Sequence, residues 1–191
     1  MTPETNTATR SPTPDWSPFR LAEPGAHADA PRSIHSFEGM GDRMRAAAFA
    51  EIQAVHSFNW AAFHFEDAPA SLRSAWKGLA LAEERHLGWL LKRMTDLSIA
   101  VDERKVSDQL WISLQSCKSA KEFALYMANA EERGRKAGER FYTEMKNRDA
   151  VTAEIFRRIA EEEVEHIALA AKYFPEGRAD RDSASSAGNA N

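Results

Sequence analysis

The sequence predicts an all-α fold, a four-helix bundle made of two helical hairpins joined by a longer crossover. Apolar residues recur at steps of three and four from about residue 41 to residue 174, which is the period of an amphipathic helix. Six of the eight prolines lie in the first 31 residues, so the helical part is almost free of helix breakers. No alternating pattern typical of a strand competes with this reading.

The first hairpin is predicted from two apolar stripes separated by the short break EDAP. One helix covers about 41–65, and the next begins at Pro69, a residue favoured in the first turn, and runs to about 96. A longer connection over 97–118 follows, with a short helix expected at 108–114. This connection is the crossover of the predicted bundle.

The second hairpin is predicted from its capping residues as well as from its stripes. Ser119 and Glu122 have the spacing of a capping box and open a helix that runs to about residue 145. Asp149 can cap the last helix, which must stop before Pro175. The turn between these helices is short, so we expect them to be antiparallel neighbours.

The chain divides into three parts by composition. Residues 1–35 are rich in proline and polar residues, and we expect them to be disordered or loosely packed. Residues 36–175 form the predicted bundle, and residues 176–191 are small and polar, which predicts a flexible tail. A chain of 191 residues suits one such domain.

Charge and cysteine content exclude several classes of protein. A formal net charge of -4 disfavours a nucleic-acid binder, and a single cysteine, Cys117, excludes a disulfide-stapled domain. No apolar run is long enough to span a membrane, and the N-terminus lacks the pattern of a signal peptide. We therefore expect a cytoplasmic protein that does not bind membranes.

Each of the four predicted long helices carries a glutamate on its apolar face, and two of them add a histidine one turn later. The residues are Glu51, Glu83, His86, Glu131, Glu163 and His166. Antiparallel helices joined by a tight turn place residues equidistant from that turn at the same height. Glu51 and Glu83 are centred on residue 67, and Glu131 and Glu163 on residue 147, so both hairpins bring their acids to one level.

Four carboxylates buried at one level need compensating charge, because desolvation and mutual repulsion disfavour the ionised forms. Two divalent cations would supply four positive charges. Oxygen and nitrogen ligands without thiolate favour iron, and also suit manganese, a mixed manganese–iron pair, or zinc. The pattern therefore predicts a site for two iron ions, with the six residues above as ligands.

Four segments of the chain resemble the motifs of the ferritin-like di-iron carboxylate superfamily. AEIQAVHSFNWA, LAEERHLGWLLKRM, NAEERG and EEEVEHIALAAKYF are most similar to a bacterial ferritin-like family of unknown function, with motifs ELQA, AxEExxHF, LEARG and DEIxHV. The resemblance covers about residues 44–175 and implies a ferritin-like bundle. It supports Glu131 over Glu132 as the ligand, in line with the helical pitch, which rotates Glu132 about 100° away from the apolar stripe. Two departures are Glu162 in place of Asp and Tyr173 in place of Trp.

Less specific explanations apply to several of these residues. A lone Glu-x-x-His is common on solvated helix faces, and Glu162 is either a surface carboxylate or an acceptor for the outer nitrogen of His86. His56 and His64 lie off the Glu51 stripe and are not expected to be ligands.

The function predicted from this site is that of a di-iron oxidase or oxygenase. Its partners would be O₂, an unknown substrate and an electron donor, and a homodimer is left open. Substrate is expected to approach between the first and third long helices, near Val55, Phe58 and Tyr126. The alternatives are a ferroxidase that stores or detoxifies iron, and a metal-free interaction bundle.

Overall fold

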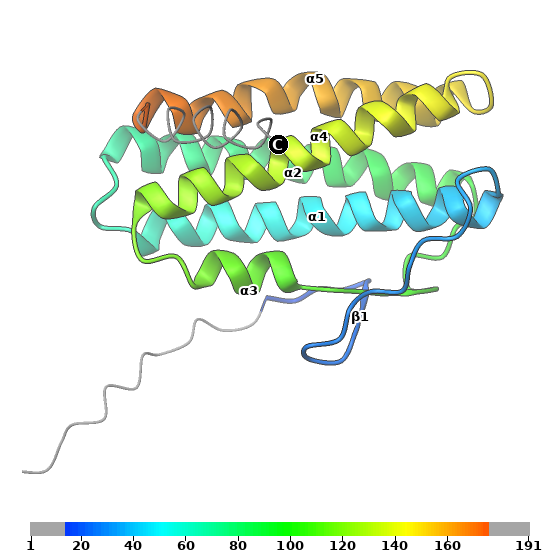
Figure 1. Cartoon of the computed structure of the whole chain (residues 1–191), viewed down its shortest axis with the longest axis horizontal. Coiled ribbons are helices and arrows are strands. Elements are labelled where there is room, and N and C mark those ends of the chain that lie inside the picture. The colour runs from blue at the N-terminus through cyan, green and yellow to red at the C-terminus, as the bar shows by residue number, and fades with distance from the viewer. Residues whose placement is uncertain (1–13, 176–191) are drawn as a thin grey trace, which may run out of the picture.

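The computed structural model describes residues 14–175, and within this range the chain is all-α apart from two very short strands. Four long helices lie side by side, with a short helix beside them (Figure 1). The elements in chain order are β1 (Arg20–Leu21), α1 (Phe37–His64), α2 (Ala70–Asp96), β2 (Lys105–Val106), α3 (Gln109–Gln115), α4 (Ala120–Met145) and α5 (Ala150–Tyr173).

Capping side chains define where three of the four long helices begin, namely α1, α4 and α5. Ser36 caps α1 by accepting a hydrogen bond from the Gly39 amide, and Ser119 caps α4 by accepting one from the Glu122 amide. Asp149 caps α5 in the same manner. The predicted caps at Ser119 and Asp149 are therefore confirmed, and Pro69 lies immediately before α2 rather than inside it.

Two apolar clusters form the core, one on each side of the level of the predicted acids. The first cluster includes Met44, Leu90 and Phe141, and the second includes Trp76 and Phe123. Each long helix contributes to both clusters, so the central part of every helix is held from two sides. The predicted acids thus lie on rigid segments.

The structure differs from the prediction of a loosely packed segment over residues 1–35. In residues 14–35 the side chains of Trp16 and Phe19 are only 5% and 8% exposed, because they pack into the first apolar cluster. Two isolated aromatic residues among prolines have no helical or strand period, so the pattern gave no sign of this docking. Residues 1–13 and the predicted flexible tail, 176–191, lie outside the described residues.

The two strands were not expected from the sequence. β1 pairs in parallel with β2, with Arg20 opposite Lys105 and Leu21 opposite Val106. Each strand has only two residues, too few for a recognisable alternation. The pairing attaches the N-terminal segment to the connection between α2 and α3.

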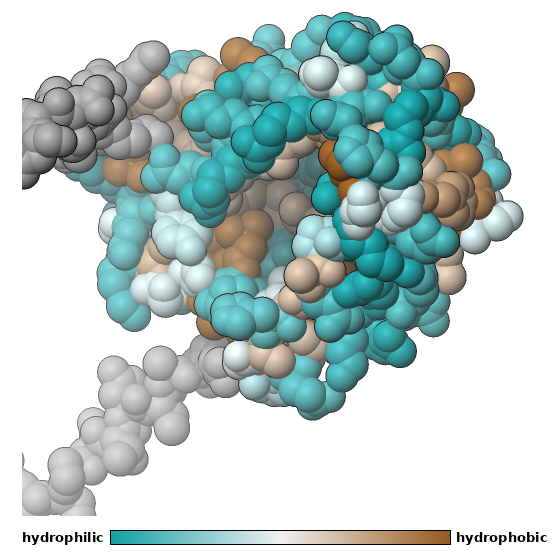
Figure 2. Space-filling model, turned by 45° about the vertical axis from the view of Figure 1, so that its right-hand side comes forward, coloured by the Kyte–Doolittle hydropathy of each residue, from teal (hydrophilic) through white to brown (hydrophobic). Residues whose placement is uncertain are grey.

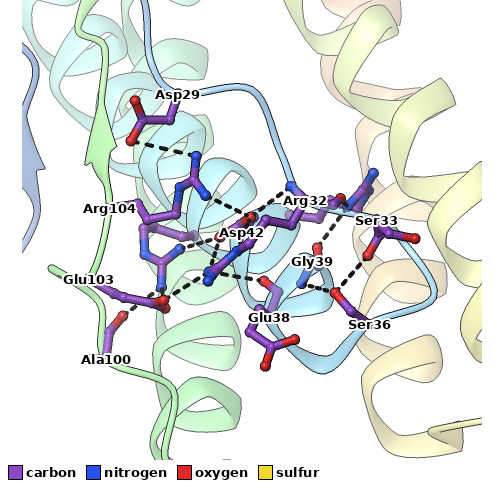
Figure 3. Close-up of polar contacts among 12 residues, drawn as sticks. Asp29, Arg32, Ser33, Ser36, Glu38, Gly39, Asp42, Ala100, Glu103 and Arg104 are labelled. Atoms are coloured by element: carbon purple, nitrogen blue, oxygen red, sulfur yellow. Dashed lines mark hydrogen bonds and ion pairs between the residues drawn. The ribbon is translucent and has the colours of Figure 1, made fainter.

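A network of ion pairs fastens the same segment at the start of α1 (Figure 3). Asp42 accepts hydrogen bonds from Arg32 and Arg45, and both arginines also pair with Glu103. Arg45 is 1% exposed and also donates to two backbone carbonyls of the connection that follows α2. The buried guanidinium is thus fully compensated, as a buried charge requires.

No helix within residues 14–175 has both the length and the apolar composition that crossing a membrane would require.

Replacing Asp42 by asparagine should destabilise the protein. The Asp42→Asn change removes the negative charge that faces Arg32 and the buried Arg45, and we expect the free energy of unfolding to fall by about 2 kcal/mol at neutral pH. Urea unfolding followed by circular dichroism measures this. As a control, Glu154→Gln removes an exposed ion pair with Arg157 and should change stability by less than about 0.5 kcal/mol. Equal losses in both variants would contradict the assigned role of Asp42.

The contribution of Asp42 should also depend on pH. Burial raises the pKa of Asp42, but the hydrogen bonds from Arg32 outweigh burial and bring the pKa down to about 2. An unfolded chain has an aspartate pKa of about 3.9, so the charged form stabilises the fold above that pH and this contribution is lost as the pH falls toward 2. We expect the stability difference between the natural chain and Asp42→Asn to shrink over that range. A difference that stays constant down to about pH 2 would refute this.

Candidate metal centre

The structure brings all six predicted ligands together near the middle of the four long helices. α1 supplies Glu51, α4 supplies Glu131, and α2 and α5 each supply a glutamate with a histidine one turn later. The spacing of three residues places each such pair on one face of its helix. The prediction that both hairpins deliver their acids to one level agrees with this arrangement.

Both histidines direct their Nδ1 atoms at the same two glutamates. His86 Nδ1 lies 3.4 Å from Glu83 Oε2 and 3.6 Å from Glu163 Oε1. His166 Nδ1 lies 2.8 Å from Glu83 Oε1 and 3.5 Å from Glu163 Oε2. Glu83 and Glu163 therefore each turn one oxygen toward each histidine.

The remaining two glutamates divide between the two histidines. Glu51 joins the group around His86, with its Oε2 atom 3.8 Å from His86 Nδ1, and Glu131 joins the group around His166. In each group of four residues the ligand atoms lie within 4.8 Å of one another, and Glu83 and Glu163 belong to both groups. This buried cluster of carboxylates and imidazoles can hold a metal ion.

Several atoms of the cluster have no hydrogen-bond partner, although they are buried. They are Glu83 Oε1, His86 Nδ1, Glu131 Oε1, Glu163 Oε2 and His166 Nδ1. The 2.8 Å approach of His166 Nδ1 to Glu83 Oε1 lacks the alignment of a hydrogen bond. Buried polar atoms without partners are costly and rare in folded proteins. Because these atoms converge, a cation between them would satisfy several at once, so the residues fit a metal.

The electrostatics of the cluster favour a bound cation. Burial raises the pKa of Glu51 and Glu131 well above the usual value, and the neighbouring carboxylates raise it further. Burial alone would lower the pKa of His86, but the nearby carboxylates of Glu163, Glu51 and Glu83 outweigh it and raise the pKa to about 12. Glu51 and Glu131 therefore hold protons unless a cation compensates them. The pKa of Glu83 shifts the other way, because burial raises it but His166 and His86 outweigh burial and lower it to about 2.

Glu162 holds the outer nitrogen of His86. Its Oε2 atom lies 3.0 Å from His86 Nε2, and the same carboxylate pairs with Arg85. This contact fixes the ring of His86 so that Nδ1 faces the cluster. Two explanations were left open for Glu162, a surface carboxylate or an acceptor for His86. The structure shows the contact with His86. The role of Arg85, which anchors Glu162, was not expected from the sequence.

The two adjacent glutamates of α4 face opposite ways, as the helical pitch predicts. Glu131 directs its Oε1 atom inward, where it is buried, whereas Glu132 pairs with Arg135 and Lys136 on the outer side. The hydrogen bond from Arg135 lowers the pKa of Glu132 to about 2. Glu132 is therefore compensated outside the cluster.

The other histidines of the described helices lie outside the cluster. The ring of His56 packs edge-on against Trp16, with centroids 5.2 Å apart, and His64 stacks on Trp60 at 4.3 Å. Both histidines were expected to lie away from the ligands, in agreement with these contacts.

A cavity of about 710 Å³ lies between α1 and α4 and reaches all four glutamates of the cluster. Figure 2 shows a hollow in the face of the molecule, with apolar residues on its floor and hydrophilic residues around it. The cavity lies between the two helices where substrate was expected to approach, but its lining differs from the residues named for that approach. Val55, Phe58 and Tyr126 are absent from the cavity lining, and Phe58 is buried in the second apolar cluster.

Comparison with known proteins gives a family but no closer relative. No curated protein matches the chain, and no solved structure does either. Residues 3–187, almost the whole chain, match one family model. The chain therefore belongs to the family described as "Protein of unknown function (DUF455)".

Proposed function

We propose that this protein is a ferritin-like protein that holds two metal ions and uses them to activate O₂, as an oxidase or oxygenase. The observation that carries the proposal is the sharing of Glu83 and Glu163 between two four-residue groups. A carboxylate that offers one oxygen to each of two positions is suited to bridge two ions. Glu51 and His86 would complete one position, and Glu131 and His166 the other.

The arrangement of the ligands on the helices supports the ferritin-like assignment. One glutamate comes from each of two helices, and a Glu-x-x-His pair comes from each of the other two, which is the ligand pattern of di-iron carboxylate bundles. The two helical hairpins are separated by the connection that contains α3, as a crossover requires. The motifs quoted above point to the same superfamily.

The donor set favours iron or manganese, because it combines carboxylate oxygen with imidazole nitrogen and has no thiolate. A pair of iron ions supplies the electrons and Lewis acidity needed to reduce O₂. The protein's own residues hold and orient the centre. Glu162 fixes the ring of His86, and the apolar clusters above and below shield the carboxylates from water on those two sides.

The cavity favours an organic substrate over iron storage. A ferroxidase passes iron ions and needs no apolar chamber, whereas a cavity of about 710 Å³ beside the glutamates is of the size that binds small organic molecules. The five buried atoms without partners count against a metal-free interaction bundle. In such a bundle the free-energy cost of removing these atoms from water would not be offset by any interaction. An electron donor would be needed as a further partner.

Metal stoichiometry tests the proposal. Protein loaded anaerobically with Fe(II) and desalted should retain two irons per chain by elemental analysis, and should change its absorbance on exposure to air. Glu131→Ala should lose one iron, because Glu131 belongs to only one of the two groups.

The matched control is Glu132→Ala, which removes the neighbouring carboxylate on the outer face and should retain both irons. Equal losses from the two variants would mean that α4 does not present Glu131 to a metal. A natural chain that retains no iron, manganese or zinc would reject the proposal altogether. A large shell of many subunits in solution would favour the ferroxidase.

The contact between Glu162 and His86 should tune metal affinity. Glu162→Gln weakens the hydrogen bond to His86 Nε2, and we expect metal affinity to fall about 10-fold or more. Competition with a chelator of known affinity measures this. Glu161→Gln, which alters an exposed neighbour paired with Arg157, should leave the affinity unchanged. Unchanged affinity in Glu162→Gln would show that the contact does not support a metal ligand.

A further inference from the structure

The cavity between α1 and α4 owes its shape to small residues that face each other across the two helices. They include Ala47, Ala50 and Ala54 of α1, and Ala130, Gly134 and Ala137 of α4. A Cβ atom added at Gly134 would meet nothing within 4 Å, so a larger side chain would find room there. The small residues thus leave a chamber open between α1 and α4.

The two ends of the chamber differ in charge. The glutamates of the cluster form one end, whereas Arg43 and Arg140 line the other together with a single acid, Glu144. Along α4, Arg140 is nine residues from Glu131, which corresponds to about 13 Å of helix. An elongated molecule can therefore reach from the arginines to the cluster through a mainly apolar space.

Arg140 is the cation best placed to receive an anion. Arg135 also lines the cavity, but it is held by Glu132 and Glu139, and Arg43 donates to backbone carbonyls. Within the part of the chain that the structure describes, Arg140 has neither an ion pair nor a hydrogen bond. Its guanidinium is thus free to pair with a carboxylate or a phosphate group.

We propose that the cavity binds an amphipathic organic anion, with an apolar chain directed toward the glutamate cluster and a carboxylate or phosphate group at Arg140. The unpaired guanidinium of Arg140 sets this orientation, because bound metals would neutralise the four carboxylates at the other end. The inference rests on the proposed function, because this molecule is a substrate only if the cluster holds the metals. Binding itself can be measured apart from turnover.

Four ligands with the same ten-carbon chain separate the contributions of chain and head group. Decanoate, decyl phosphate, decanol and decyltrimethylammonium are titrated into the full-length metal-loaded protein under anaerobic conditions, with calorimetry as the readout. We expect decanoate or decyl phosphate to bind about fivefold more tightly than decanol, which is the effect of one partly exposed ion pair, and the ammonium to bind most weakly. The tighter of the two anions identifies the head group.

Two pairs of variants test the position of the ligand. Gly134→Leu fills the chamber and should weaken every ligand at least about tenfold, whereas Gly88→Leu, at another helical glycine with open space around it, should weaken none. Arg140→Gln should reduce the affinity of the anions to that of decanol and leave decanol unchanged. Arg133→Gln, an exposed arginine of α4 that does not line the cavity, is its control.

Several outcomes would overturn the inference. They are no binding of either anion, an affinity for both anions no greater than that for decanol, or equal effects of Gly134→Leu and Gly88→Leu. Affinity for decanoate that depends on metal loading but not on Arg140 would place the head group at the cluster, which also contradicts it. Iron content measured on the same samples separates the two proposals. Two retained irons without anion binding refute only the substrate class, whereas anion binding without retained metal refutes the proposed function.

Discussion

The burial of four carboxylates at one level is the constraint on which the rest of the structure depends. Each of these groups costs free energy when it leaves water, and each repels the other three in its ionised form. The cluster must therefore be compensated by the two histidines together with bound protons or a cation. Glu83 and Glu163 lie between the two histidines, and each places one carboxylate oxygen near each imidazole ring. A helical bundle can maintain this arrangement only if its helices cannot slide or rotate.

The remaining structure holds the helices in register. The two apolar clusters lie on either side of the acids, so sliding of any helix would move a carboxylate into an apolar layer. The ion pairs around Asp42 fasten the start of α1 to the connection after α2 (Figure 3). Trp16 and Phe19 cover the same region from outside. These contacts lie outside the cavity. Within the cavity, small residues leave the acids accessible.

Much of the candidate site could be predicted from the sequence, because it depends on helical geometry within single hairpins. The choice of Glu131 over Glu132 follows from a rotation of about 100° per residue, and the common level of the acids follows from equal distances to a turn. The helix caps at Ser119 and Asp149 are likewise local. The docking of Trp16, the pairing of β1 with β2, and the anchoring of Glu162 by Arg85 were not predictable in this way, since each joins segments far apart in the chain.

The sequence by itself determined which residues can be ligands, on which helices they lie and at what height. These properties follow from the helical period, which each segment carries independently of its neighbours. Only the tertiary structure decided that Glu83 and Glu163 lie between the histidines, and that Glu162 reaches His86. It also decided that the alanines of α1 face Gly134 across an open chamber. The physical reason is that distances between helices depend on how two surfaces pack, and no single helix contains that information.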